Sequence, residues 1–286
     1  MELFFDMLRS IVYGVIEGIT EWLPISSTGH MILAEQVLKF SLSAEFMEMF
    51  RVVIQLGAIL AVVVLYFKKL WPFCGDNGRD SGLAKHIRWP VLRLWLKIIV
   101  ACLPAAVLGL LLDDWMDAHL YNSVVVAIML IVYGIAFILI ERRPRVPTTT
   151  KLSRITYKQA ILVGAWQVLA LIPGTSRSGA TIIGGLLCGM SRACASQFTF
   201  FLAIPVMAGA SGLKLVKFLA KGGVFTLGEV GTLLVGCIVA FVVSILAIRF
   251  LMDYVKKHTF TVFGWYRIAL GILVLGIWAL QSFVLA

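Results

Sequence analysis

The stretch EGITEWLPISSTGH, residues 17–30, places two carboxylates, three consecutive hydroxyl side chains and an imidazole inside an otherwise apolar sequence. A single charge at the centre of a lipid-embedded helix costs about 2.5 to 3.5 kcal/mol on insertion scales, so such groups usually face a polar cavity. We therefore interpret this stretch as a functional site and expect the surrounding apolar segments to form the scaffold that holds it.

The spacing within this stretch predicts a helix, a break and the start of a second helix. Glu17 and Glu21 are four residues apart and share one helical face, while Pro24 biases Leu23 away from helical geometry. The hydroxyl residues 26–28 favour helix N-caps, where free N–H groups attract anions. Carboxylates beside an anion site imply a bridging cation. The alternative is that the hydroxyls only cap a helix and the glutamates pair with basic neighbours.

The composition indicates an integral membrane protein. Of the 286 residues, 60% are hydrophobic and only 14% are charged, and the mean hydropathy is +0.97, which excludes a soluble domain of ordinary composition. The formal charge of +10 does not indicate nucleic-acid binding, because the basic residues cluster in loops between apolar runs, where they orient a protein in the lipid bilayer.

The apolar runs on either side of residues 17–30 are each shorter than the roughly 20 residues that a membrane span needs, which favours a re-entrant hairpin of two helices. Two loops rich in basic residues, after residue 67 and after residue 140, indicate the cytoplasmic side. Full transmembrane helices are expected at about residues 50–67, 98–112, 124–140, 198–219, 230–250 and 262–285.

A second broken apolar segment, residues 160–190, resembles the first. Its centre, IPGTSRSGATI at residues 172–182, again places an apolar residue and a proline before a hydroxyl-rich turn with glycine, as in LPISSTGHMI at residues 23–32. The predicted fold is therefore an all-α polytopic membrane domain over residues 1–286, with six transmembrane helices and two re-entrant hairpins. Residues 1–143 and 155–286 form an inverted-topology repeat, which brings the two turns together at the bilayer midplane.

The second turn combines hydroxyl donors, flexible backbone and the guanidinium of Arg177, a group suited to bidentate phosphate binding, so we interpret it as an oxyanion clamp. The alternative is a packing loop in which Arg177 only neutralises Glu17 or Glu21. Gln55, a polar residue within the first full span, suits either helix packing or contact with the substrate.

These side chains favour the hydrolysis of a phosphoanhydride in a membrane. Glu17 and Glu21 could hold a hard cation, Mg²⁺ or Ca²⁺, through oxygen ligands. A serine hydroxyl or a water molecule, activated by a base such as His30, could then attack phosphorus while Arg177 and the metal stabilise the developing charge.

The chain resembles the bacterial undecaprenyl-diphosphate phosphatase family of the bacitracin-resistance type. The resemblance covers essentially the whole chain and rests on the motifs at residues 17–30, 52–62 (VVIQLGAILAV) and 173–182 (PGTSRSGATI). The resemblance implies removal of the terminal phosphate from a polyprenyl diphosphate, which recycles the lipid carrier of peptidoglycan synthesis. It also implies a location in the bacterial inner (plasma) membrane with a site that opens to the outer, periplasmic side. By this resemblance the site residues are Glu17, Glu21, Ser26, Ser27, Thr28, His30, Ser176, Arg177, Ser178 and Thr181.

Three alternatives stay open from the sequence. Ser27 is the preferred nucleophile, with His30 as acid or base, and direct attack by a metal-bound water is the alternative. A lipid-carrier flippase or transporter would use the same anion clamp, since inverted repeats with broken helices are typical of transporters. The oligomeric state is also open, and a homodimer is compatible with the sequence.

Overall fold

The computed structural model describes residues 2–38, 40–75, 86–143 and 146–284, and these residues form helices and no β-strand. Two short 3₁₀ helices, Leu152–Arg154 and Leu169–Leu171, accompany the α-helices. The α-helices are α1 (Glu2–Thr20), α2 (Ser27–Val37), α3 (Ala44–Val53), α4 (Gln55–Leu65), α5 (Phe67–Leu70), α6 (Trp89–Leu120), α7 (Ser123–Glu141), α8 (Tyr157–Val168), α9 (Arg177–Leu187), α10 (Arg192–Ala220), α11 (Leu227–Lys257) and α12 (Thr261–Val284).

Six helical segments in the described part of the chain are long and apolar enough to cross a membrane, so the protein is a multi-pass membrane protein. They comprise α3 with α4, then parts or all of α6, α7, α10, α11 and α12. Each of the six spans expected from the sequence overlaps one of these segments. The second is longer than predicted, because its helix α6 begins at Trp89, nine residues before the predicted start, and includes Pro104 without a break.

Both broken segments have the predicted helix, turn and helix. The helix α1 ends at Thr20, a turn follows, and α2 begins at Ser27. The helix α8 ends at Val168, and after the short 3₁₀ helix and a turn α9 begins at Arg177. With 11 residues each, α2 and α9 are about 16 Å long, which is about half the thickness of a bilayer core.

The N-caps of α2 and α9 share one unusual backbone conformation. Ser26 has φ 72° and Ser176 has φ 70°, and within the described residues these are the two non-glycine positions with positive φ. Each serine side chain accepts a hydrogen bond from the backbone N–H of the glycine three residues later, Gly29 or Gly179. A left-handed backbone costs a non-glycine residue roughly 1–2 kcal/mol, and the cap hydrogen bond offsets part of that cost.

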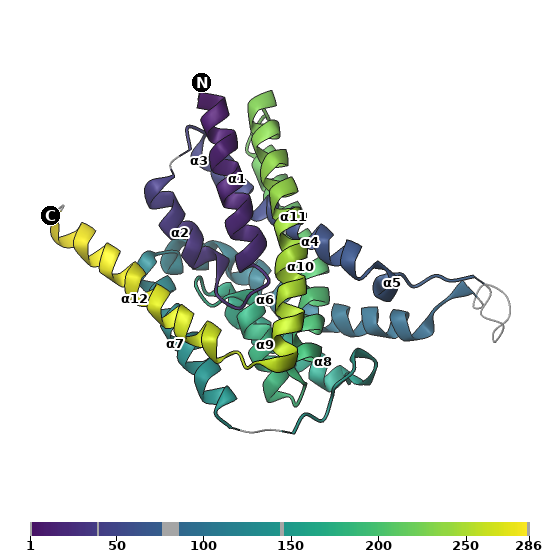
Figure 1. Cartoon of the computed structure of the whole chain (residues 1–286). Coiled ribbons are helices and arrows are strands. Elements are labelled where there is room, and N and C mark those ends of the chain that lie inside the picture. Colours follow the sequence, from purple (N-terminus) through teal and green to yellow (C-terminus); the bar gives the residue numbers. More distant parts are fainter. Residues whose placement is uncertain (1, 39, 76–85, 144–145, 285–286) are drawn as a thin grey trace.

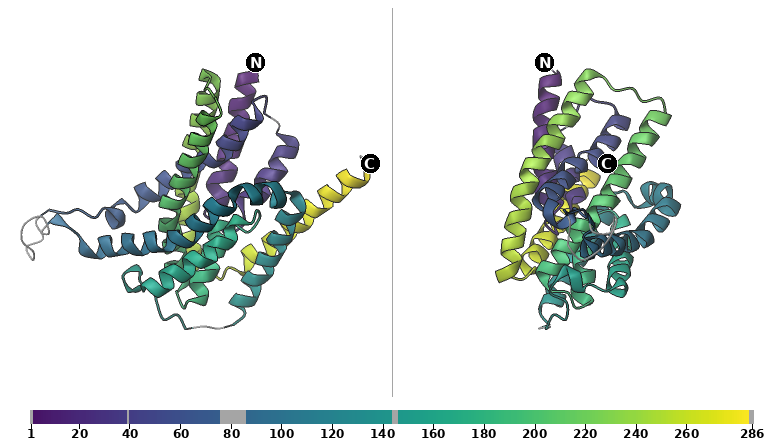
Figure 2. Two further views of the ribbon diagram at one scale, coloured as in Figure 1. Left: turned by 180° about the vertical axis from the view of Figure 1, so that it is seen from behind. Right: turned by 90° about the vertical axis from the view of Figure 1, so that its right-hand side faces the viewer.

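Glycines bring pairs of helices into close contact. Figure 1 and Figure 2 show α1 (purple) beside α11 (yellow-green), where a Cβ atom at Gly14 would lie 2.7 Å from the carbonyl oxygen of Gly236. The α7–α12 contact is reciprocal: a Cβ atom at Gly134 or at Gly264 would lie 2.7 Å from the carbonyl oxygen of the other. Neither contact leaves room for a side chain, so these helix pairs depend on glycine.

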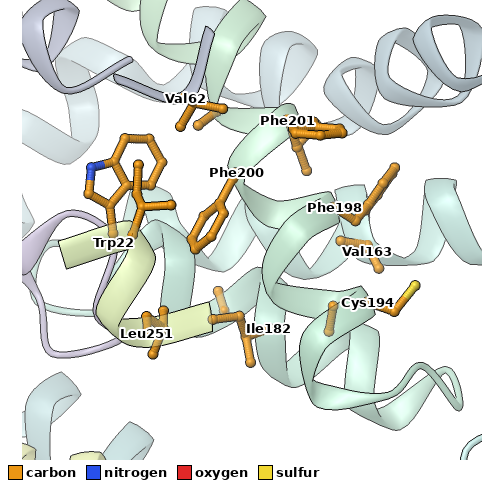
Figure 3. Close-up of a cluster of buried hydrophobic side chains, with 14 of the residues drawn as sticks. Trp22, Val62, Val163, Ile182, Cys194, Phe198, Phe200, Phe201 and Leu251 are labelled. Carbon is orange, nitrogen blue, oxygen red and sulfur yellow. The ribbon is translucent and has the colours of Figure 1, made fainter. Parts of the chain in front are cut away.

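The main apolar core lies beside the first turn. Figure 3 shows Trp22 from the turn among side chains of α4, α8, α9, α10 and α11, including Phe200 and Leu251. The Trp22 ring is fully buried and meets the Phe200 ring edge-on, with centroids 5.2 Å apart. The turn is therefore anchored in the core, which fixes the position of Glu21, the residue next to Trp22 in the turn.

Candidate functional site

The two turns meet, as the sequence predicted. Glu21, from the first turn, accepts hydrogen bonds at Oε1 from Nη2 and Nε of Arg177, at 3.1 and 3.3 Å. The hydroxyl of Ser178 donates a 3.4 Å hydrogen bond to the carbonyl oxygen of Leu23. Residues about 155 positions apart in the chain thus form one polar cluster inside an apolar protein.

Arg177 is fixed from three directions. Besides Glu21, it donates from Nη1 to the carbonyl oxygen of Thr199 at 3.1 Å, and its guanidinium carbon lies 5.9 Å from the centre of the Trp22 ring. The side chains of Arg177 and Glu21 are 11% and 8% exposed. Because both ions are largely removed from water, each needs the other to offset the loss of solvation.

Glu21 also orients the candidate nucleophile. Its second oxygen, Oε2, accepts a 3.2 Å hydrogen bond from the hydroxyl of Ser27. Glu21 therefore connects Ser27 to Arg177 through its two oxygens. A hydroxyl that donates to a carboxylate turns an oxygen lone pair outward, which is the orientation that nucleophilic attack requires.

Glu17 lies beside Glu21 as the four-residue spacing predicted. The residue is 1% exposed, its carboxyl group lies near that of Glu21, and its Oε1 atom has no hydrogen-bond partner. Two adjacent carboxylates must share a proton or a cation. The orphaned oxygen and the all-oxygen donor set fit a hard divalent cation. Within the described residues no third acidic, histidine or cysteine side chain joins them, so hydroxyls, water and the substrate would complete the coordination.

His30 lies one turn along α2 from Ser27, but its ring contacts other groups. Nδ1 is 2.8 Å from the carbonyl oxygen of Ser26, and Nε2 is 2.7 Å from the hydroxyl of Tyr266, whose ring stacks on the imidazole. A carbonyl oxygen only accepts, so Nδ1 carries a proton and Nε2 accepts from Tyr266 when the ring is neutral. The hydrogen-bond partner of Ser27 is thus Glu21 and not His30.

The remaining predicted residues of the second motif lie at the N-cap and in the first two helical turns of α9. The hydroxyls of Ser176 and Ser178 are 3.1 Å apart. Thr181 donates to the carbonyl oxygen of Arg177 at 2.8 Å and accepts from the hydroxyl of Thr199 at 2.9 Å. These contacts stabilise the start of α9, and a contact of these hydroxyls with the substrate stays a prediction.

Thr28 and Gln55 are two predicted site residues that the structure, over the residues it describes, does not connect to this cluster by a hydrogen bond. Thr28 is the partly buried second residue of α2, and Gln55 is the half-buried first residue of α4. Among the described residues no hydrogen bond joins either side chain to Glu21 or Arg177. Their predicted roles in substrate binding remain predictions.

Two residues of α12 were missed by the sequence reasoning. Tyr266 contacts His30, and Arg267, fully buried, donates to backbone carbonyls of both turns. A signal for Arg267 was present, because a lone arginine within a predicted apolar span is costly and is usually retained for a purpose. Its partners could not be inferred, since they lie about 92 and 243 positions away.

Comparison with known proteins adds an independent line of evidence. Residues 10–273 match the family model described as bacitracin resistance protein BacA. Curated relatives named undecaprenyl-diphosphatase include one from Enterococcus faecalis (strain ATCC 700802 / V583), 60% identical over 96% of this chain and 99% of its own length. Others are from Lactococcus lactis subsp. cremoris (strain SK11), 56% identical over 98% and 99%, and Streptococcus thermophilus (strain ATCC BAA-250 / LMG 18311), 57% identical over 94% and 92%.

The family model spans nearly the whole chain and includes both turns of the polar cluster. The alignments cover 99% of the length of the relatives from Enterococcus faecalis and Lactococcus lactis subsp. cremoris. The chain therefore belongs to the bacitracin resistance protein BacA family.

Proposed function

We propose that this protein hydrolyses undecaprenyl diphosphate to undecaprenyl phosphate and inorganic phosphate, and so recycles the lipid carrier for peptidoglycan and envelope polysaccharide synthesis. The relatives' shared name, undecaprenyl-diphosphatase, supports the reaction. The observation that carries the site assignment is Glu21 joined to both Arg177 and Ser27 where the two turns meet. A nucleophile, an anion clamp and a carboxylate pair are the groups that phosphoanhydride hydrolysis needs.

In this mechanism the hydroxyl oxygen of Ser27 attacks the terminal phosphorus while its proton passes to Glu21. The bond from that phosphorus to the bridging oxygen breaks, and the protonated imidazolium of His30, held by Ser26 and Tyr266, supplies its Nε2 proton to the departing undecaprenyl phosphate. Water then attacks the phosphoserine, and its oxygen bonds to phosphorus while one of its protons passes to His30. The bond from phosphorus to the Ser27 oxygen breaks as Glu21 returns its proton to Ser27, which releases inorganic phosphate. Arg177 and the free N–H groups of α9 stabilise the charge on the transferred group. Attack by water without a phosphoserine is the alternative.

The cofactor in this proposal is Mg²⁺ or Ca²⁺, held by Glu17 and Glu21. The orphaned Oε1 of Glu17 supports this assignment, because a buried carboxylate oxygen without a partner is costly. When bound, the cation would polarise the diphosphate oxygens and offset their charge. The chain's own contribution is to hold both carboxylates side by side, Glu17 from α1 and Glu21 from the turn that follows it.

The proposed architecture is two inverted repeats, residues 1–143 and 155–286, each with one re-entrant hairpin, in the bacterial inner membrane with the site open to the periplasm. Support comes from Ser26 and Ser176, caps of equal conformation 150 residues apart. The helix contacts also correspond, because α1 packs on α11 through Gly14 as α8 packs on α6 through Gly164. A homodimer remains compatible with this arrangement.

The test is release of inorganic phosphate from a polyprenyl diphosphate by purified protein in detergent with Mg²⁺ or Ca²⁺. Wild-type protein should turn over, and Glu21→Gln and Arg177→Lys should each lose nearly all activity. Arg192→Lys is the matched control, because Arg192 pairs with Glu141 outside the site. Full activity of Glu21→Gln would contradict the site assignment.

A lipid-carrier flippase is the second candidate, and the broken helices α1–α2 and α8–α9 favour it. Transport alone leaves the Ser27–Glu21 hydrogen bond without a purpose, because binding needs no nucleophile. Wild-type protein that binds the diphosphate lipid and moves it across a vesicle membrane, with no phosphate released, would favour the flippase.

A further inference from the structure

Arg267 is a fully buried cation in the second turn of the apolar helix α12. Removing a guanidinium from water is costly, so its surroundings must supply acceptors in the right geometry. The structure supplies backbone carbonyls for this purpose. Arg267 donates to the carbonyl oxygens of Pro24 (3.2 Å), Met129 (3.5 Å), Leu130 (3.5 Å), Gly174 (2.9 Å) and Thr175 (2.8 Å).

These acceptors belong to three separate parts of the fold. Pro24 lies in the first turn of the site, Gly174 and Thr175 lie in the second, and Met129 and Leu130 lie in α7. One guanidinium therefore connects both turns to the α7–α12 pair. The planar, forked shape of arginine allows this, because its donors point outward in several fixed directions at once.

Among the described residues, no carboxylate pairs with Arg267. The partners of its hydrogen bonds are neutral carbonyls, and the ring of Tyr133 lies 5.4 Å from the guanidinium carbon. A group kept only to neutralise charge would contact an acid. The pattern instead is that of a cation whose donors hold backbone segments in place.

The held backbone lies next to the groups of the polar cluster. Pro24 is three residues after Glu21 and two before Ser26, and Thr175 is two residues before Arg177. A shift of either turn would lengthen the 3.1 Å contact between Glu21 and Arg177 and move Ser27 relative to both. The alignment of the site thus depends on a residue outside it.

We propose that Arg267 is a positioning residue that holds the two turns of the site in a fixed position relative to each other. This rests on the proposed phosphatase site. Without the guanidinium, turnover falls because Ser27, Glu21 and Arg177 lose their alignment, while binding of the diphosphate lipid is less affected.

The test compares Arg267→Lys and Arg267→Met with wild type in detergent, on a defined polyprenyl diphosphate, below the unfolding temperature of each variant. Lysine keeps the positive charge but lacks the planar guanidinium whose donors point in several fixed directions. We expect kcat of Arg267→Lys to fall about 10- to 100-fold, as for a misplacement of about 1 Å, with KM within about threefold, and Arg267→Met to fall further. Arg192→Lys, an arginine-to-lysine change in the Glu141 ion pair, should keep the wild-type kcat.

Other outcomes would overturn the proposal. An increase in KM with unchanged kcat would make Arg267 a substrate-binding group, and a lower Tm with wild-type kcat and KM would make it purely structural. If Arg267→Met does not fold, the kcat and KM of Arg267→Lys decide. Glu21→Gln in the same assay distinguishes a failure of this proposal from a failure of the proposed phosphatase site. If Glu21→Gln is inactive and Arg267→Lys equals wild type, only the role of Arg267 is wrong.

Discussion

Ser26 and Ser176, 150 residues apart in the chain, adopt the same left-handed backbone conformation and cap helices of equal length. Each side chain accepts a hydrogen bond from the N–H of a glycine three residues later. The two caps lie at the end of the two polar turns, immediately before α2 and α9, so the same local geometry presents Ser27 on one side and Arg177 on the other.

Replacing Ser176 separates backbone strain from capping. Ser176→Ala loses the cap and keeps the unfavourable φ, whereas Ser176→Gly loses the cap and removes the strain. We expect Ser176→Ala to lower the unfolding free energy by about 1–2 kcal/mol and Ser176→Gly to lower it by less. Thermal unfolding in detergent measures both, and an equal loss would show that the positive φ carries no cost.

Removing the hydroxyl of Ser27 tests the nucleophile. Ser27→Ala should abolish nearly all phosphate release, because the attacking oxygen is gone while Glu21 and Arg177 remain paired. The measurement is steady-state phosphate release, with trapping of a phosphoserine in the wild-type protein by rapid acid quench. Substantial turnover by Ser27→Ala would point to direct attack by water.

His30 and Tyr266 form a hydrogen-bonded pair, and we expect their replacement to lower kcat by different factors. His30→Gln should lower kcat by about 100-fold, within the usual range for the loss of a general acid. Tyr266→Phe removes only the hydroxyl at 2.7 Å from Nε2 and keeps the ring stack, so its kcat should fall by a smaller factor. Equal kcat for His30→Gln and wild type would leave His30 without an acid or base role.

Chelation tests the two carboxylates. Treatment with EDTA should stop phosphate release, and added Mg²⁺ or Ca²⁺ should restore it, because Glu17 and Glu21 offer oxygen ligands. Glu17→Gln should raise the metal concentration needed for half-maximal activity, since one anionic ligand is lost. Activity that persists after complete chelation would contradict the proposed cofactor.

The contact between α7 and α12 gives a stability prediction with a control in the same helix. Gly264→Ala places a Cβ atom 2.7 Å from the carbonyl oxygen of Gly134, whereas nothing lies within 4 Å of a Cβ atom at Gly276. Gly264→Ala should therefore lower the unfolding free energy by about 1–3 kcal/mol, and Gly276→Ala should not lower it. Similar unfolding temperatures for the two variants would show that α7 and α12 separate easily.

The sequence by itself determined which segments are helices and where the chain breaks. Long apolar runs specify spans because each backbone polar group in lipid must be satisfied within its own helix. Pro24 and Pro173 with the hydroxyl residues after them marked the two turns, and the spacing of Glu17 and Glu21 placed both carboxylates on one face. These features are local, so they can be recognised in the chain alone.

The tertiary structure decided which groups touch. It paired Ser27 with Glu21 and turned His30 toward Tyr266, although Ser27 and His30 are neighbours on α2. It also brought Arg267 to the carbonyls of both turns. The physical reason is that hydrogen bonds select partners by position in space, and the packing of α12 against α7 sets the positions of residues more than 90 places apart in the chain.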